Sequence, residues 1–142
     1  GQLLVLAAAG NRGVEIRHAE LSRLVAALGH GDLLVIGDAG LPVPHGVGVI
    51  DLALRPGVPG LLETLATVLE ELPVEAGVIA EEFPGASPTT HAALLAAWPA
   101  DAALRKVPHE ELKRLSERAH AIVRTGEFTP YANVVLVAGV AF

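Results

Sequence analysis

The sequence predicts an α/β domain in which a mainly parallel central sheet is flanked by helices. Two kinds of segment alternate along the chain: short, fully apolar runs, and longer runs whose apolar residues recur every three or four positions. The short runs are typical of strands buried on both faces, as in parallel sheets. Their alternation with helices is typical of layered α/β folds. No repeat or linker divides the 142 residues, so we expect a single domain.

In the first half of the chain, turn residues separate the two kinds of segment. Apolar residues at i, i+3, i+4 and i+7 from Leu21 form one helix face, and Gly29 stands where a C-terminal cap is expected. Pro56 and Gly57 end the second apolar run. The patterns predict a helix over 18–28, strands over 33–36 and 49–54, a helix over 61–72 and a strand over 76–80.

The second half of the chain continues this alternation. A Pro-rich turn at 84–88 precedes "SPTTHAALLAAW", which is typical of a capped helix. Another helix begins at Pro108, and its apolar stripe extends from Leu112 to Ile122. We expect a weaker strand over 103–107 and a closing strand over 133–142.

The composition excludes several classes of protein. Apolar residues make up 51% of the chain, and a mean hydropathy of +0.48 favours apolar surface buried between subunits. No apolar run approaches the roughly 18 residues of a membrane helix, so we expect no membrane insertion. A net charge of −6 without a basic cluster argues against nucleic acid as a partner. The absence of cysteine excludes disulfides and cysteine-ligated metals, and it fits a reducing compartment.

Residues 1–13, "GQLLVLAAAGNRG", form a separate N-terminal segment. Their apolar stretch is short, and no basic region precedes it as in a secretory signal. We expect an extra edge strand or a disordered leader here rather than a targeting signal.

The sequence contains fragments of familiar catalytic and cofactor-binding motifs but none of them complete. "HEELK" at 109–113 begins like a zinc-protease helix, but Lys113 stands where the second histidine ligand must be, and no metal site is predicted. "GVGVID" at 46–51 lacks the third glycine of a dinucleotide-binding turn, and no nucleophile elbow occurs. The remaining candidates are side chains for acid–base catalysis and hydrogen bonding.

His30, Asp38 and the pair Glu81–Glu82 flank predicted strands. His30 follows a helix C-terminus, where the dipole favours an imidazolium and suits a proton donor. The acids follow apolar strands, and ligands of open α/β sheets bind beyond the carboxyl ends of strands. By position alone, His30 is better explained as a surface histidine that finishes a helix. Acids of this kind cap helices or solvate loops at least as often as they bind ligands.

His109, Tyr131 and Asn133 add further polar groups. His109 opens a predicted helix, where the positive dipole end suits either a neutral hydrogen-bonding group or a substitute for an N-terminal cap. Tyr131 and Asn133 precede the last strand, and alternate residues of an extended segment point to the same side. A phenol and an amide offer donors and acceptors suited to sugar hydroxyls. The alternative is an ordinary strand entry with a packed ring.

Six segments together resemble the ribose pyranase family, cytoplasmic ribose-utilisation proteins of bacteria. They are "LGHGD", "GDAGLPVP", "VEAGVIAEE", "PHEEL", "RTGEFTPYAN" and "LVAGVAF", in the family's order and spacing. The resemblance gives an expected domain at 14–142 and leaves 1–13 as the leader. The related fucose mutarotases are expected to differ at Gly40-Leu41-Pro42, where an Asn-Phe-Pro-like run would stand, and at Ala132, where glycine would stand.

The resemblance implies an isomerase that interconverts the β-pyranose and β-furanose forms of D-ribose without a cofactor. It implies that His30 is the proton donor, that Asp38, His109, Tyr131 and Asn133 contact the sugar, and that Ala132 gives backbone contacts. It also implies a cytoplasmic homodecamer of two stacked five-membered rings. Two alternatives stay open: an L-fucose-type mutarotase, and a non-catalytic ribose-binding partner of the ribose transporter.

His30 and Asp38 lie on opposite sides of the predicted strand 33–36. Eight extended residues would separate them by roughly 26 Å. Either the glycines around them fold the chain back sharply, or one site combines groups from neighbouring chains. With the apolar composition, we expect a site at a subunit interface.

Overall fold

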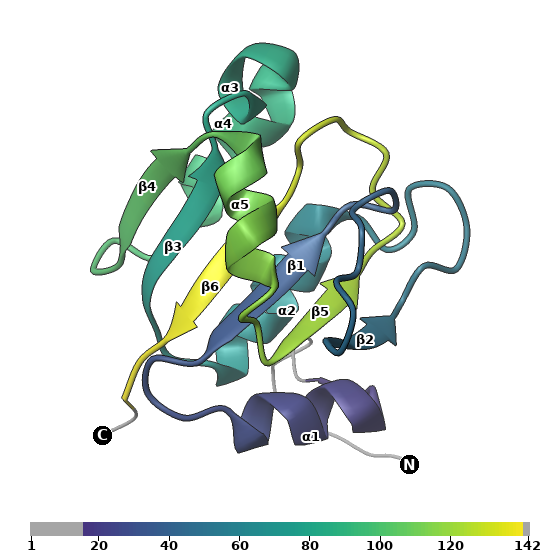
Figure 1. Cartoon of the computed structure of the whole chain (residues 1–142), viewed down its shortest axis with the longest axis vertical. Coiled ribbons are helices and arrows are strands. Elements are labelled where there is room, and N and C mark those ends of the chain that lie inside the picture. Colours follow the sequence, from purple (N-terminus) through teal and green to yellow (C-terminus); the bar gives the residue numbers. More distant parts are fainter. Residues whose placement is uncertain (1–15, 141–142) are drawn as a thin grey trace, which may run out of the picture.

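The computed structural model describes residues 16–140, which form a six-stranded sheet with helices on both faces (Figure 1). The expected leader, residues 1–13, lies outside the described residues. In chain order the elements are α1 (Ala19–Ala27), β1 (Leu33–Gly37), β2 (Gly48–Asp51), α2 (Leu61–Glu71), β3 (Val74–Ala80), α3 (Phe83–Ala86), α4 (Pro88–Ala97), β4 (Ala103–Val107), α5 (His109–Ser116), β5 (Ala121–Arg124) and β6 (Val134–Ala138).

The expected α/β layering is confirmed, and the sheet is mixed: most of its strands are parallel, as expected, but one strand is reversed. Its strand order is β2-β5-β1-β6-β3-β4. β1 and β2 both pair with β5 in parallel, and β3 pairs with β4 in parallel, whereas β6 is antiparallel to both β1 and β3. Five strands therefore share one direction. β6 runs against them, and residues 125–133 connect it to β5 at one edge of the sheet.

The expected helix from Pro108 to Ile122 is wrong in its second half. α5 ends at Ser116, and Ile122 belongs to β5, where it pairs with Val35 and Val49. A short apolar run cannot be assigned to a helix or a strand by periodicity alone, and this run continued the helical stripe in phase. Its β-branched residues favour the strand that forms.

Three further boundaries differ from the expectation. The chain at 84–88 contains the short helix α3 rather than only a turn. Gly29 is not the cap of α1: Leu28 is, and the left-handed residue of this loop is Gly31, with φ 87°. The strand predicted over 49–54 ends at Asp51, because its Oδ1 accepts the N–H of Ala53 and turns the chain.

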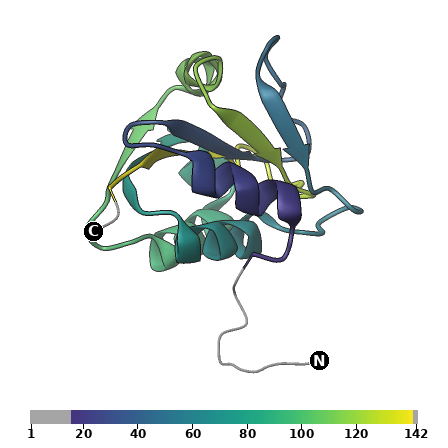
Figure 2. The same cartoon turned by 90° about the horizontal axis from the view of Figure 1, so that it is seen from below.

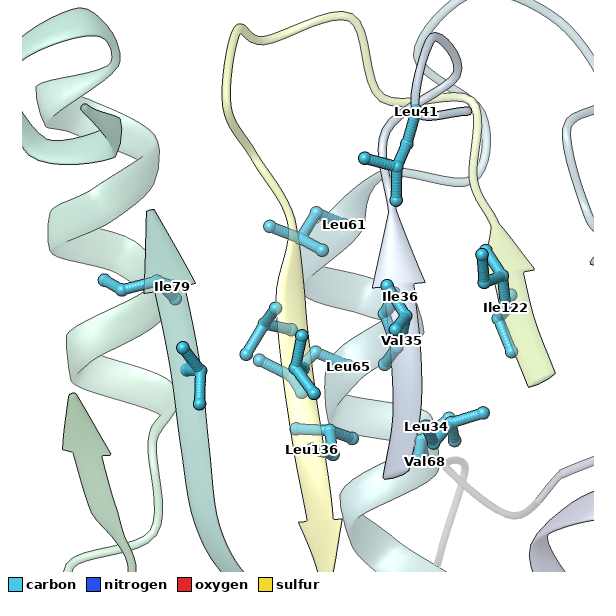
Figure 3. Packing of buried hydrophobic residues seen from close by; sticks show 14 of the residues in the cluster. Leu34, Val35, Ile36, Leu41, Leu61, Leu65, Val68, Ile79, Ile122 and Leu136 are labelled. Carbon is cyan, nitrogen blue, oxygen red and sulfur yellow. The ribbon is translucent and has the colours of Figure 1, made fainter. Parts of the chain in front are cut away.

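Helices cover the two faces of the sheet unequally. α2 and α4 pack together on one face, and α5 lies on the other against β3 and β6 (Figure 2). Leu61, Leu65 and Val68 of α2 are fully buried next to the apolar residues of β1 (Figure 3). The core is mainly aliphatic, as the composition predicts, and Phe83 is its one fully buried aromatic side chain among the described residues. No helix within residues 16–140 has the length and apolarity to cross a bilayer.

Trp98 packs against β3 at Gly77, where a larger residue would collide with its ring. Its indole N–H donates to the carbonyl of Ala102 at 2.8 Å, which fixes the ring. A methyl carbon built on Gly77 would lie 2.2 Å from Cη2 of Trp98. The glycine therefore allows the ring to approach the strand closely.

We predict that Gly77→Ala lowers the free energy of unfolding by about 1–3 kcal/mol, because the new methyl group overpacks the site under Trp98. Urea unfolding at one fixed protein concentration measures this. Gly48→Ala is the matched control, since a methyl group there meets no atom within 4 Å. Equal midpoints for the two variants would contradict the packing argument.

Candidate active site

The predicted site residues lie at two opposite edges of the sheet. We call the edge at the C-terminal ends of the five parallel strands the carboxyl edge, and the opposite one the amino edge. His30 precedes β1 at the amino edge. The other residues follow β1 and β4 or precede β6 at the carboxyl edge: Asp38, His109, Tyr131, Ala132 and Asn133. The five residues of β1 separate the edges by about 16 Å.

Asn133 and Asp38 meet directly at the carboxyl edge. The backbone N–H of Asp38 donates to Oδ1 of Asn133 at 2.7 Å, across 95 residues of sequence. This bond fixes the amide orientation, since only the oxygen can accept. Asn133 is fully buried, and its Nδ2 has no hydrogen-bond partner within the described residues. An unsatisfied buried donor costs about 1–3 kcal/mol, which a ligand hydroxyl would relieve.

Tyr131 does not lie in an extended segment, so the expected alternation of Tyr131 and Asn133 on one side of a strand is wrong. Its φ is 61°, in the left-handed region that residues other than glycine seldom adopt. The N–H of Asn133 donates to the carbonyl of Tyr131 at 2.9 Å and closes this tight bend. Strain of this kind is often found at functional sites.

His109 lies beside Tyr131, although the backbone at Tyr131 is left-handed rather than extended. The two rings meet edge to face, with centroids 5.0 Å apart. His109 is the first residue of α5, as predicted, but it is not a cap: its backbone N–H donates to the Glu82 carboxylate, 3.0 Å from Oε1. Nδ1 of His109 is buried without a partner among residues 16–140. With Asn133 Nδ2, two site candidates carry unpaired buried atoms at this edge, and Nε of Arg124, at the C-terminal end of β5, is a third.

Glu127 anchors the loop that carries Tyr131 and Asn133. Its Oε1 accepts the N–H of Leu61 at 2.8 Å, at the start of α2, and its Oε2 accepts the hydroxyl of Thr129. Its backbone carbonyl accepts the N–H of Ala39 at 2.9 Å. One residue thus connects the loop 125–133, the loop after β1 and a helix terminus.

The charges around α5 are largely paired with one another. Glu110 follows His109, and the pKa of Glu110 is lowered by its hydrogen bond and charge attraction to Lys113, whose Nζ lies 2.9 Å away. This carboxylate is exposed and engaged with Lys113, which makes it a poor candidate for a proton-transfer group. Within residues 16–140, no three acidic or histidine side chains gather closely enough to hold a metal ion.

His30 stands apart from these groups within one chain. It lies on an exposed turn two residues after the cap of α1, and its Nε2 is 2.6 Å from Oε1 of Glu75. The N–H of Gly29 donates to the Asp32 carboxylate at 2.8 Å, which closes the turn. The chain does not fold back sharply enough to bring His30 to Asp38.

Sequence reasoning missed Glu75 and Glu127. The strand containing Glu75 was expected to begin at Ala76, which left the acid outside any element. Glu127 lies in "RTGEFTPYAN" without a local pattern to distinguish it from a solvated loop residue. An earlier start of the strand at Val74 would have placed Glu75 at the same edge as His30.

Known proteins resemble this chain in both sequence and fold. The model of the RbsD / FucU transport protein family matches residues 14–141. A D-ribose pyranase of Variovorax paradoxus is 57% identical over 129 residues, which cover 88% of this chain and 95% of the relative. A D-ribose pyranase of Symbiobacterium thermophilum is 56% identical over 125 residues, covering 86% of this chain and 92% of the relative.

Solved structures give the same result. Bacillus subtilis RbsD complexed with D-ribose matches with a TM-score of 0.87 and 42% identity, covering 93% of this chain and all of that one. The Streptococcus pneumoniae fucose mutarotase in complex with L-fucose matches with a TM-score of 0.71 and 22% identity, covering 88% of this chain and 94% of that one, and so shares the fold. On these matches, the chain belongs to the RbsD/FucU transport protein family.

Proposed function

We propose that this protein is a D-ribose pyranase, an isomerase that interconverts the β-pyranose and β-furanose forms of D-ribose. The observation that carries the proposal is the identity of 51–57% to D-ribose pyranases over most of the chain. The likeness to a ribose-bound RbsD supports the same sugar. Structures of FucU and of a fucose mutarotase are more distant, at 26% and 22% identity, which favours ribose over fucose.

The reaction needs only proton transfers. A proton reaches the ring oxygen of the pyranose while water takes another from the anomeric hydroxyl, and the bond between C1 and the ring oxygen breaks to give the aldehyde. After rotation, the C4 hydroxyl adds to the aldehyde as it loses its proton to the protein, and the new anomeric oxygen gains one from water. No proton is consumed overall. General acid–base groups typically accelerate such steps by about 10²- to 10⁴-fold.

We assign these roles to the residues that the sequence predicts. His30 gives and takes the proton at the ring oxygen. Asn133 Nδ2 and His109 Nδ1 are two unpaired polar atoms that can hydrogen-bond sugar hydroxyls, with Asp38 and Tyr131 beside them. The backbone at Ala132 completes the contacts.

In the proposed assembly, His30 of one copy faces the carboxyl edge of its neighbour. The two edges of one chain are too far apart for one pentose to span, which supports a site shared between copies. Exposed apolar side chains support association as well: Leu54 is 79% exposed, and Phe128, in the site loop, is 64% exposed. We propose a homodecamer of two stacked five-membered rings, working in the cytoplasm on free ribose.

His30→Ala is expected to abolish the accelerated exchange between ribose ring forms, because no group then delivers the proton. Saturation-transfer NMR on ribose and on fucose, at equal enzyme concentration, measures this. The unaltered protein should accelerate ribose exchange more than fucose exchange. Ribose binding without any acceleration would instead support a non-catalytic binding partner, and faster fucose exchange would support a mutarotase of the fucose type.

Mixing two variants, each without one of the two histidines, tests whether the site is shared. His30→Ala removes a group at the amino edge, and His109→Ala removes one at the carboxyl edge while keeping the backbone N–H that binds Glu82. After subunit exchange, about a quarter of shared sites would combine an intact His30 with an intact neighbouring His109. We expect recovered exchange activity in the mixture, with each variant alone as the control. Absence of recovery in fully exchanged oligomers would place the site within one chain.

A further inference from the structure

Glu75 is the hydrogen-bond partner of His30, and the proposed mechanism gives it no role so far. Nε2 of His30 and Oε1 of Glu75 are 2.6 Å apart, although 45 residues separate them in sequence. The two side chains are 62% and 47% exposed. A contact between two half-exposed side chains persists only if the backbone places both of them.

The end of β6 provides this placement, because it lies between the two segments. The carbonyl of Ala138 accepts the N–H of Gly31 at 2.9 Å, in the turn that carries the imidazole. The N–H of Gly139 donates to the carbonyl of Pro73 at 2.7 Å, directly before β3. The turn and the start of β3 are therefore both held on one short stretch of backbone.

Glu75 also occupies an irregularity of the sheet. Val74 pairs with Ala138, and Ala76 pairs with Val137, so two steps along β3 match one step along β6. Glu75 is the extra residue of this bulge. Bulges re-aim a side chain that a regular strand would point elsewhere, and they recur beside active sites.

We propose that Glu75 is a positioning residue that fixes the tautomer and the orientation of the His30 imidazole. A carboxylate can only accept, so Nε2 of His30 carries a proton in both protonation states, and the bond is charge-assisted in the imidazolium. Nδ1 is then the nitrogen that exchanges a proton with the sugar. Its proton passes to the ring oxygen on opening and leaves a neutral ring still bound to Glu75; reclosure reverses the transfer.

This inference rests on the proposed role of His30, but its first test does not. Solid-state NMR of protein labelled with ¹⁵N-histidine, recorded at alkaline pH, reports which imidazole nitrogen is protonated; the His30 signal is the one lost in His30→Ala. The unaltered protein should show the Nε2-protonated form alone, and Glu75→Leu should show a mixture with the Nδ1-protonated form. Glu70→Gln, on the exposed side of α2, is the control for the loss of one carboxylate. An unchanged tautomer in Glu75→Leu overturns the inference, whatever the activity.

The second test separates positioning from binding. Glu75→Leu is expected to lower kcat for ribose by about 10- to 100-fold, the range found for carboxylate partners that orient metal-binding histidines, with KM within about twofold. Glu75→Gln keeps an acceptor oxygen and should lose less, and Glu70→Gln should lose nothing. Unchanged kcat in Glu75→Leu, with His30→Ala inactive, overturns the positioning role. Full activity of His30→Ala would refute the proposed role of His30 instead, and the NMR result would still decide whether Glu75 fixes the imidazole.

Discussion

The antiparallel position of β6 between β1 and β3 is the constraint on which both edges of the sheet depend. At its start, β6 brings Asn133 against the backbone of Asp38. At its end, Ala138 and Gly139 hold the segments that carry His30 and Glu75. A parallel strand in this place would enter from the amino edge and would carry Asn133 away from Asp38. Residues 125–133 join the end of β5 to the start of β6 at this one edge, so the two strands run in opposite directions.

The sequence predicted an element well wherever its apolar residues followed only the helical pattern or only the pattern of a buried strand. The helix predicted over 61–72 forms over Leu61–Glu71, and the strand predicted over 33–36 extends by one residue to Gly37. β5 was missed because its apolar residues continued the phase of the preceding helix, and only pairing with β1 and β2 decides between the two structures. Strand direction could not be foreseen for β6, because alternation of side chains is the same in parallel and antiparallel pairs.

At the candidate site, residue types were predictable and contacts were not. Polar residues at strand ends identified Asp38 and Asn133 as candidates, but the bond between them joins positions 95 residues apart. No feature of the sequence predicts the left-handed backbone of Tyr131, because residues other than glycine seldom adopt it. The bulge at Glu75 depends on the register between β3 and β6, which no local pattern encodes.

The two edges differ in a way that suits two separate tasks. At the carboxyl edge, the Asn133 amide is buried and its oxygen is already bound, so Nδ2 cannot turn to find another partner. A donor held in this way selects a ligand by position, and little reorganisation is needed when a hydroxyl binds. At the amino edge, the imidazole lies on an exposed turn, where proton exchange is easy but orientation has to come from a partner carboxylate. In the proposed assembly, contact between copies joins the rigid binding edge to the proton-transfer group, so catalysis would depend on association as directly as on any side chain.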